Sequence, residues 1–207
     1  KGGGKTVTVA AGLIDRVQKY PGSKYFIASA TYQTAIDSTA TELVEICDIM
    51  GVRVIWRDTM IIDRKKHKHV YYFPEFHSVI CIRSADNMDM IEGSKWDGAA
   101  ISEVTLWQPM DVRTALSRLR RGKADHCKLI DGLAEDETFW TYEWLKENRF
   151  HIFTVNTYEN RPNLPPDYIP NMERMYPGDL GRRYLMGEAV SISRIPTLPN
   201  YRDAIHR

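Results

Sequence analysis

The chain has 207 residues, with 28 basic and 27 acidic side chains and a net charge of +1. This length allows one substantial hydrophobic core, and the balanced charge excludes nucleic-acid binding through a global field, so any such contact must come from local patches. No apolar run approaches the roughly 20 residues needed to cross a bilayer, and the three cysteines and six histidines lack metal-ligand spacing. We therefore expect no membrane partner and no Cys/His metal site.

The first six residues, KGGGKT, resemble the closing half of a phosphate-binding loop. Glycines let backbone N–H groups converge on a phosphate, a lysine adds positive charge, and a threonine hydroxyl suits Mg²⁺. The predicted nucleotide-binding residues are Gly2, Gly3, Gly4, Lys5 and Thr6. The full pattern begins with a glycine that would precede residue 1, so we expect the first strand to be missing or truncated at the N-terminus.

Apolar spacing then alternates between helix and strand periods, which is typical of an α/β sheet with crossover helices. Helices are predicted at residues 6–19 and from 32 to a stop at Gly51, and strands at 24–30, 52–56, 70–73 and 78–83.

The densest basic run, residues 64–69, lies between two of these strands. One interpretation is a solvated hairpin tip. The other is a loop in which Lys65 and Lys66 contact a phosphate backbone.

A short apolar strand at residues 98–101 is followed by Ser102 and Glu103. A phosphate-loop ATPase needs a carboxylate here to align and deprotonate the attacking water, and we assign that role to Glu103. Ser102 can hydrogen-bond a metal-bound water but brings no charge.

Further elements follow in the second half of the chain. A helix is predicted after Pro109, and its basic end offers Arg118, Arg120 and Arg121 either to solvent or to DNA or a neighbouring subunit's phosphates. Strands are predicted at 125–132 and 151–155, helices at 136–148, 167–176 and near 181–187, and a linker at 191–207. The aromatic residues of the 136–148 helix indicate core or interface packing rather than base stacking.

The order of these motifs resembles the ATPase domain of the large terminase subunit of tailed bacteriophages. The resemblance depends on residues 2–6, on Ile91-Glu92-Gly93 followed by Glu103, on residues 129–132, and on residues 157–165. It implies an ASCE or RecA-like P-loop NTPase fold with a mostly parallel sheet flanked by helices. Residues 1–190 would form the ATPase domain, and 191–207 would lead to a C-terminal nuclease domain, the only part expected to cut DNA.

The resemblance also implies residue roles and cofactors. Lys5 would bind the β- and γ-phosphates of ATP, Thr6 and, through water, Ser102 would hold Mg²⁺, and Asp131 and Gly132 would form the coupling motif. Three positions depart from the family pattern: Ser102 replaces an aspartate, Gly132 a Thr or Ser, and Glu92 an arginine that can complete a neighbour's site. An arginine finger would then come from Arg83, from residues 118–121 or from upstream.

The implied function is ATP hydrolysis that moves double-stranded viral DNA into a procapsid. The implied partners are this DNA, the portal ring, the small terminase subunit and further copies in a homo-oligomeric ring, with the protein in the host cytoplasm docked on the procapsid. Two alternatives stay open: a nucleic-acid helicase or remodelling ATPase, and a nucleotide-binding assembly module without hydrolysis.

Overall fold

The computed structural model describes residues 4–133 and 139–190. The chain separates into two compact units, Lys5–Gly132 and a second one formed by Lys1–Gly4 with Leu133–Arg207. The predicted extent of the ATPase domain, residues 1–190, stays a prediction, and the predicted linker at 191–207 lies outside the described residues.

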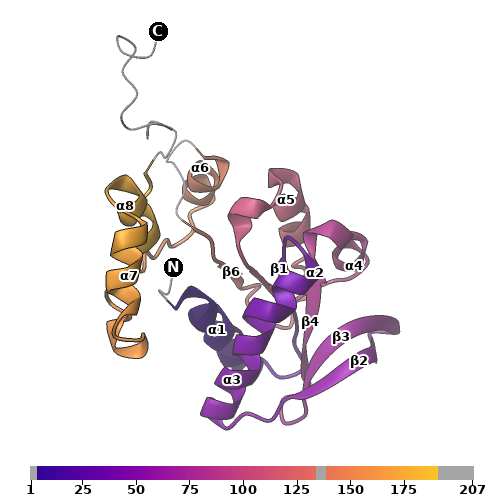
Figure 1. Cartoon of the computed structure of the whole chain (residues 1–207). Coiled ribbons are helices and arrows are strands. Elements are labelled where there is room, and N and C mark those ends of the chain that lie inside the picture. Colours follow the sequence, from indigo (N-terminus) through magenta and orange to yellow (C-terminus); the bar gives the residue numbers. More distant parts are fainter. Residues whose placement is uncertain (1–3, 134–138, 191–207) are drawn as a thin grey trace, which may run out of the picture. The chain divides into compact units, whose positions relative to one another are not determined.

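The first unit is built on a six-stranded sheet in the order β2-β3-β4-β1-β5-β6 (Figure 1). Four strands run parallel: β1 (Lys24–Ser29), β4 (Ser78–Ser84), β5 (Gly98–Ile101) and β6 (Lys128–Ile130). The other two, β2 (Ile55–Ile62) and β3 (Lys65–Phe73), form an antiparallel hairpin. The predicted α/β fold with a mostly parallel sheet is confirmed.

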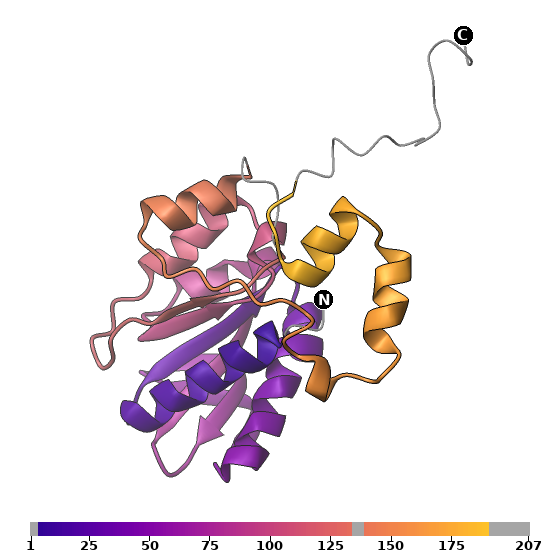
Figure 2. The ribbon, with the colours of Figure 1, turned by 90° about the vertical axis from the view of Figure 1, so that its left-hand side faces the viewer.

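Helices flank this sheet. They are α1 (Lys5–Lys19), α2 (Tyr32–Ala35), α3 (Thr41–Met50), α4 (Asp89–Glu92) and α5 (Pro109–Ser117), and a π-helical segment, Ile36–Ala40, joins α2 to α3. Helices α1 and α3 lie side by side (Figures 1 and 2) and share one apolar cluster with Tyr25 and Ile27 of β1. Alternate residues of a strand point to opposite faces, and Phe26 accordingly packs against the ring of Trp96 at 5.2 Å.

Helix α1 forms where the apolar period predicts it. Leu13, Ile14 and Val17 are fully buried and Val9 is buried, whereas Val7 is 38% exposed. The helix begins one residue earlier than predicted, at Lys5.

Only the first residue of the basic run lies at the hairpin tip, because the turn is formed by Asp63 and Arg64. Both residues have positive φ, 51° and 64°, as a two-residue hairpin turn requires. Residues 65–69 therefore belong to β3, where side chains alternate in direction, so that Lys66 and Lys68 are exposed and His67 is buried.

The second unit contains α6 (Trp140–Glu147), α7 (Tyr168–Met175) and α8 (Asp179–Met186), which confirms the helix type predicted for these regions. The start of the predicted 136–148 helix lies partly outside the described residues. Trp144 is buried and packs against Phe150 at 5.3 Å between ring centroids.

The strand predicted at 151–155 is wrong. This segment has no strand structure, and Phe153 is 85% exposed, so its apolar composition does not reflect burial in a sheet. Among the described helices of the whole chain, none has the length and apolarity to span a membrane.

Candidate active site

Parallel strands end at one common edge of the sheet, and β5 and β6 deliver polar residues there. Ser102 directly follows β5, and its backbone N–H donates to the carbonyl of Ala28 in β1 at 2.8 Å. Asp131 directly follows β6, and its N–H donates to the carbonyl of Ile101 at 3.0 Å. The two side chains therefore lie on adjacent strands at the same level.

These two side chains belong to one hydrogen-bond network. The hydroxyl of Ser102 donates to Oδ2 of Asp131 at 3.2 Å, and the backbone N–H of Glu103 donates to Oδ1 at 3.0 Å. The hydroxyls of Thr39 and Ser102 are 2.5 Å apart, and both residues are buried. Thr39 lies in the π-helical segment, and such segments are frequent at functional sites.

Asp131 is a carboxylate in a partly enclosed position. Burial raises its pKa above the usual value, opposed by the hydrogen bonds from Glu103 and Ser102 and by the positive charge of Lys5. Lys5, at the first turn of α1, is therefore close enough to act electrostatically on the edge that carries Ser102, Glu103 and Asp131.

Glu103 has a left-handed backbone, with φ 51° and ψ 48°, which is costly for a residue with a Cβ atom. Asp131 supports this conformation on both sides, because its carboxylate accepts from the Glu103 N–H and its carbonyl accepts from the Val104 N–H at 3.0 Å. Strained backbone of this kind gathers at functional sites. Here it leaves the Glu103 side chain exposed at the strand edge.

The predicted phosphate loop is described only in part, since Gly2 and Gly3 lie outside the described residues. Gly4 has a positive φ of 74°, and α1 starts at the next residue, so Lys5 and Thr6 occupy its first turn. The N–H groups of a first helical turn and the helix dipole favour anions at this end.

The donor set fits a Mg²⁺–nucleotide. No group of three or more His, Cys, Asp or Glu side chains suited to a metal occurs in residues 4–133 and 139–190. Mg²⁺ in nucleotide sites is usually held by one or two protein groups, substrate phosphates and water. A hydroxyl at Thr6, a hydroxyl at Ser102 and the carboxylate of Asp131 are of this type.

Gly132, the second predicted coupling residue, is tightly packed. A Cβ atom at this position would lie 3.2 Å from Cγ1 of Val104. A threonine or serine, as the resemblance would predict, would fit only if the Val104 side chain moved. Close packing against Val104 therefore explains the glycine at this position.

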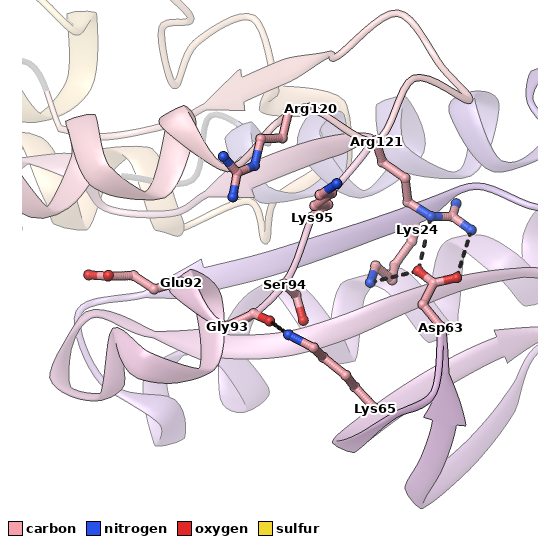
Figure 3. A pocket seen from close by; sticks show the side chains of 9 residues that line it. All are labelled: Lys24, Asp63, Lys65, Glu92, Gly93, Ser94, Lys95, Arg120 and Arg121. Carbon is pink, nitrogen blue, oxygen red and sulfur yellow. Dashed lines mark hydrogen bonds and ion pairs between the residues drawn. The ribbon is translucent and has the colours of Figure 1, made fainter.

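The predicted basic residues separate into different environments. Lys65, Arg120 and Arg121 line an open cavity of about 590 Å³ near the amino ends of β1 and β5. Its other charged lining residues are Lys24, Asp63, Glu92 and Lys95 (Figure 3). Lys66 is exposed on β3 and does not line it. Arg118 forms an ion pair with Glu92 at 3.1 Å.

Paired charges line this cavity. Asp63 accepts from Lys24 Nζ at 3.1 Å and from Arg121 Nε at 3.2 Å (Figure 3). Burial would raise the pKa of Asp63, but these hydrogen bonds and charges lower it. Burial also lowers the pKa of Lys24 despite its partner Asp63. Beneath them, the fully buried Asp97 accepts from Arg121 Nη1 at 2.7 Å.

Arg83, one expected source of an arginine finger, is 2% exposed. Its guanidinium donates to the carbonyl of Lys68 at 3.1 Å, lies 2.9 Å from Nδ1 of His67, and sits 5.2 Å from the Trp96 ring. In this position it is a core side chain rather than one that reaches a neighbouring subunit.

Sequence reasoning missed Thr39, Lys24 and Asp97. Nothing in the sequence signals them, because each is a single polar residue outside any recognisable motif. Their roles depend on partners far away in the sequence: Thr39 contacts Ser102, 63 positions away, and Asp97 contacts Lys24, 73 positions away.

Comparisons with known proteins identify a family for this chain. The family model described as "Terminase large subunit, T4likevirus-type, N-terminal" matches residues 1–195. No curated protein matches the sequence.

Solved structures show the same fold at low identity. A large terminase from a thermophilic bacteriophage aligns with a TM-score of 0.76 and 17% identity over 92% of this chain and 46% of that one. The complex of the same terminase with ATP-gamma-S aligns with a TM-score of 0.72 and 19% identity, over 91% of this chain and 45% of that one.

The ATPase domain of the Thermus phage P74-26 large terminase gives a TM-score of 0.58 and 16% identity, over 92% of this chain and 86% of that one. The chain thus spans less than half of the first of these two terminases. Because the family model covers almost the whole sequence, the chain belongs to the large terminase subunits of T4-like-virus type and contains their N-terminal region.

Proposed function

We propose that this chain is the ATPase of a viral DNA-packaging motor. The observation that carries the proposal is the hydrogen-bond network of Ser102, Glu103 and Asp131 at the carboxyl ends of β5 and β6. Lys5, in the first turn of α1, acts electrostatically on Asp131. The chain thus supplies a helix N-terminus that attracts phosphate and an exposed glutamate on a strained turn.

Each residue has a separate task in this reaction. Lys5 would bind the β- and γ-phosphates, and the hydroxyl of Thr6, with Ser102 acting through water, would hold Mg²⁺. A bound Mg²⁺ would supply positive charge to the phosphate oxygens. Glu103 orients the attacking water in line with the γ-phosphate and accepts its proton.

Asp131 and Gly132 are proposed to couple hydrolysis to movement. The carboxylate of Asp131 contacts both the backbone of Glu103 and the hydroxyl of Ser102. A displacement of Ser102 or Glu103 on loss of the γ-phosphate would therefore pass directly to the segment after β6.

Nucleotide complexes of a relative support this assignment. The large terminase of the thermophilic bacteriophage that covers 92% of this chain has also been solved with ADP and with ATP-gamma-S. Family membership extends the proposal to double-stranded DNA as the translocated polymer, to the portal ring and the small terminase subunit as partners, and to a homo-oligomeric ring. The working place would be the host cytoplasm, on the procapsid.

Steady-state ATP turnover of the full-length protein tests the site. Glu103→Gln should abolish turnover while nucleotide still binds, and Lys5→Ala should abolish turnover and weaken binding. Glu75→Gln, an exposed glutamate after β3, is the matched control and should behave like the wild type. Wild-type turnover in either site variant would refute the assignment.

The basic cavity is proposed as a contact for DNA phosphates. Lys95 and Arg120 form no ion pair among the described residues, and both carboxylates that line the cavity, Asp63 and Glu92, are already paired with arginine. These two cations are thus available to another anion.

The salt dependence of DNA binding tests this contact. Each phosphate contact contributes about 0.9 to the slope of log K against log salt concentration. Arg120→Ala should reduce the slope by about one contact, whereas Lys66→Ala, outside the cavity, should leave it unchanged. Equal slopes for Arg120→Ala and wild type would place DNA elsewhere.

The two alternatives predict other results. A helicase would separate the strands of a duplex while hydrolysing ATP. A non-hydrolysing assembly module would show no turnover with or without DNA and the portal ring. Both measurements use the same full-length protein.

A further inference from the structure

The nucleotide site has an unusual division of charge between two neighbouring strands. In P-loop ATPases an aspartate at the end of the strand that carries the catalytic glutamate holds Mg²⁺. This chain has the neutral Ser102 before Glu103, and the nearest carboxylate to Ser102 at that edge is Asp131, after the next strand, 3.2 Å from the Ser102 hydroxyl.

We infer that Asp131 supplies, from the end of β6, the Mg²⁺-orienting carboxylate that position 102 lacks. The inference depends on the proposed ATPase function and adds a residue role to it: Asp131 acts on the water shell of the metal and is more than a coupling residue.

The hydrogen bonds around Asp131 engage both oxygens of its carboxylate. One oxygen accepts from the hydroxyl of Ser102 and the other from the backbone N–H of Glu103. When Ser102 donates to Asp131, the short contact between Thr39 and Ser102 has Thr39 as its donor. The geometry of the network thus presents the carboxylate as an acceptor on both oxygens.

The remaining capacity of this carboxylate suits a hydrated cation. Each carboxylate oxygen offers about two lone-pair positions, and the protein uses one on each oxygen of Asp131. Asp131 has no ion-pair partner in the described part of the chain, and Lys5 is the positive charge that acts on it. A dication bound beside Thr6 would balance this partly buried charge.

Electrostatics also explains why position 102 is a serine. An aspartate there would place a second carboxylate about 3 Å from Asp131, and two carboxylates at that distance cannot both ionise. Ser102 and Asp131 therefore form a matched pair. The charge can lie on one strand end or on the other, but not on both.

Thr39 is a positioning residue in this arrangement. Its hydroxyl fixes the rotamer of Ser102, and Ser102 then fixes one oxygen of Asp131. The three side chains come from the π-helical segment, the end of β5 and the end of β6. They constrain Oδ2 of the carboxylate, while the Glu103 N–H binds Oδ1.

Nucleotide affinity measured with and without metal tests the inference, because it needs no turnover. The probe is ATP-gamma-S bound to the full-length protein, in excess EDTA and in excess Mg²⁺. Asp131→Asn keeps the size and an acceptor oxygen but removes the charge. It should leave the affinity in EDTA near wild type and reduce the Mg²⁺-dependent tightening about tenfold, which corresponds to about 1.4 kcal/mol.

Exchanging the two residues provides the decisive arm. The double variant Ser102→Asp/Asp131→Ser should recover most of the Mg²⁺-dependent tightening, because the charge returns to the site from the neighbouring strand. Ser102→Asp alone should do worse than the double variant, since its two carboxylates share a proton. Asp86→Asn, an exposed carboxylate that follows β4 at the same edge, is the matched control.

Two outcomes would overturn the inference: wild-type Mg²⁺ dependence in Asp131→Asn, or a Ser102→Asp single variant equal to the double variant. Failure of the proposed function is a different result. In that case the wild-type protein binds Mg²⁺ and ATP-gamma-S but hydrolyses no ATP with DNA and the portal ring present.

Discussion

The buried carboxylate of Asp97 allows a quantitative test of how the edge opposite the active site is held together. Its Oδ2 accepts from the backbone N–H of Lys24 at 2.8 Å and from Arg121 Nη1 at 2.7 Å, and its Oδ1 accepts from the N–H of Lys123 at 2.8 Å. Asp97→Asn replaces one of these oxygens by an NH₂ group, which faces another donor whichever way the amide is oriented.

The expected cost follows from burial. Breaking a buried ion pair by removing one charge typically costs about 3–5 kcal/mol, and Asp97 is 0% exposed. Arg121 keeps Asp63 as a partner, so we expect the lower end, about 3 kcal/mol. Glu92→Gln makes the same chemical change in an ion pair that is partly exposed, and exposed pairs contribute about 0–1 kcal/mol.

Urea unfolding of the full-length protein, followed by tryptophan fluorescence, measures both changes. Trp96 directly precedes Asp97 in the sequence. Its indole is fully buried and donates to the carbonyl of Ile91 at 3.0 Å, so its fluorescence reports on this region. If Asp97→Asn and Glu92→Gln differ by less than about 1 kcal/mol, burial does not set the strength of this interaction and the reasoning is wrong.

Three further predictions concern the core and its protonation. Gly98→Ala should lower the unfolding free energy by about 1–3 kcal/mol, seen as an earlier urea midpoint, because its Cβ would lie 2.8 Å from Tyr25 and Cys127 side-chain atoms. Burial lowers the pKa of His67 to about 4 from 6.5. Between these pH values the unfolded chain binds the proton more readily, so the unfolding free energy should fall by about 2 kcal/mol from pH 7 to pH 5. His67→Gln should remove this loss, and a variant whose stability depends on pH as the wild type's does would contradict the assigned burial. Thr39→Val should slow ATP turnover and cost about 1 kcal/mol in urea unfolding, whereas wild-type turnover would show that its hydroxyl does not position the site.

Regular features of the fold could be predicted because they repeat along the sequence. The apolar period of α1 and the run at β5 identify both elements, and glycine at position 51 adopts the left-handed cap, with φ 65°, that ends α3. The strand predicted at 151–155 failed because an apolar composition alone does not supply a neighbouring strand.

The site could be predicted only in part, for a physical reason. Lys5 and Glu103 follow from local motifs, whereas the contact between Thr39 and Ser102 depends on tertiary packing across 63 positions. Asp131 was expected as a coupling residue from resemblance. That its carboxylate lies against Ser102 is visible only when β5 and β6 pair.

The π-helical turn at Ile36–Ala40 has a consequence for engineering this protein. A π turn accommodates one more residue than an α turn, and each α-helical residue advances the chain by about 100°. Deleting a single residue such as Asp37 would give a smoother helix with better backbone geometry. The flanking helical segments would keep their relative orientation, because the π turn already absorbs the extra residue, but Thr39 lies within the turn and its hydroxyl beside Ser102 would lose its position. A shortened variant could thus melt at a higher temperature and yet hydrolyse ATP more slowly.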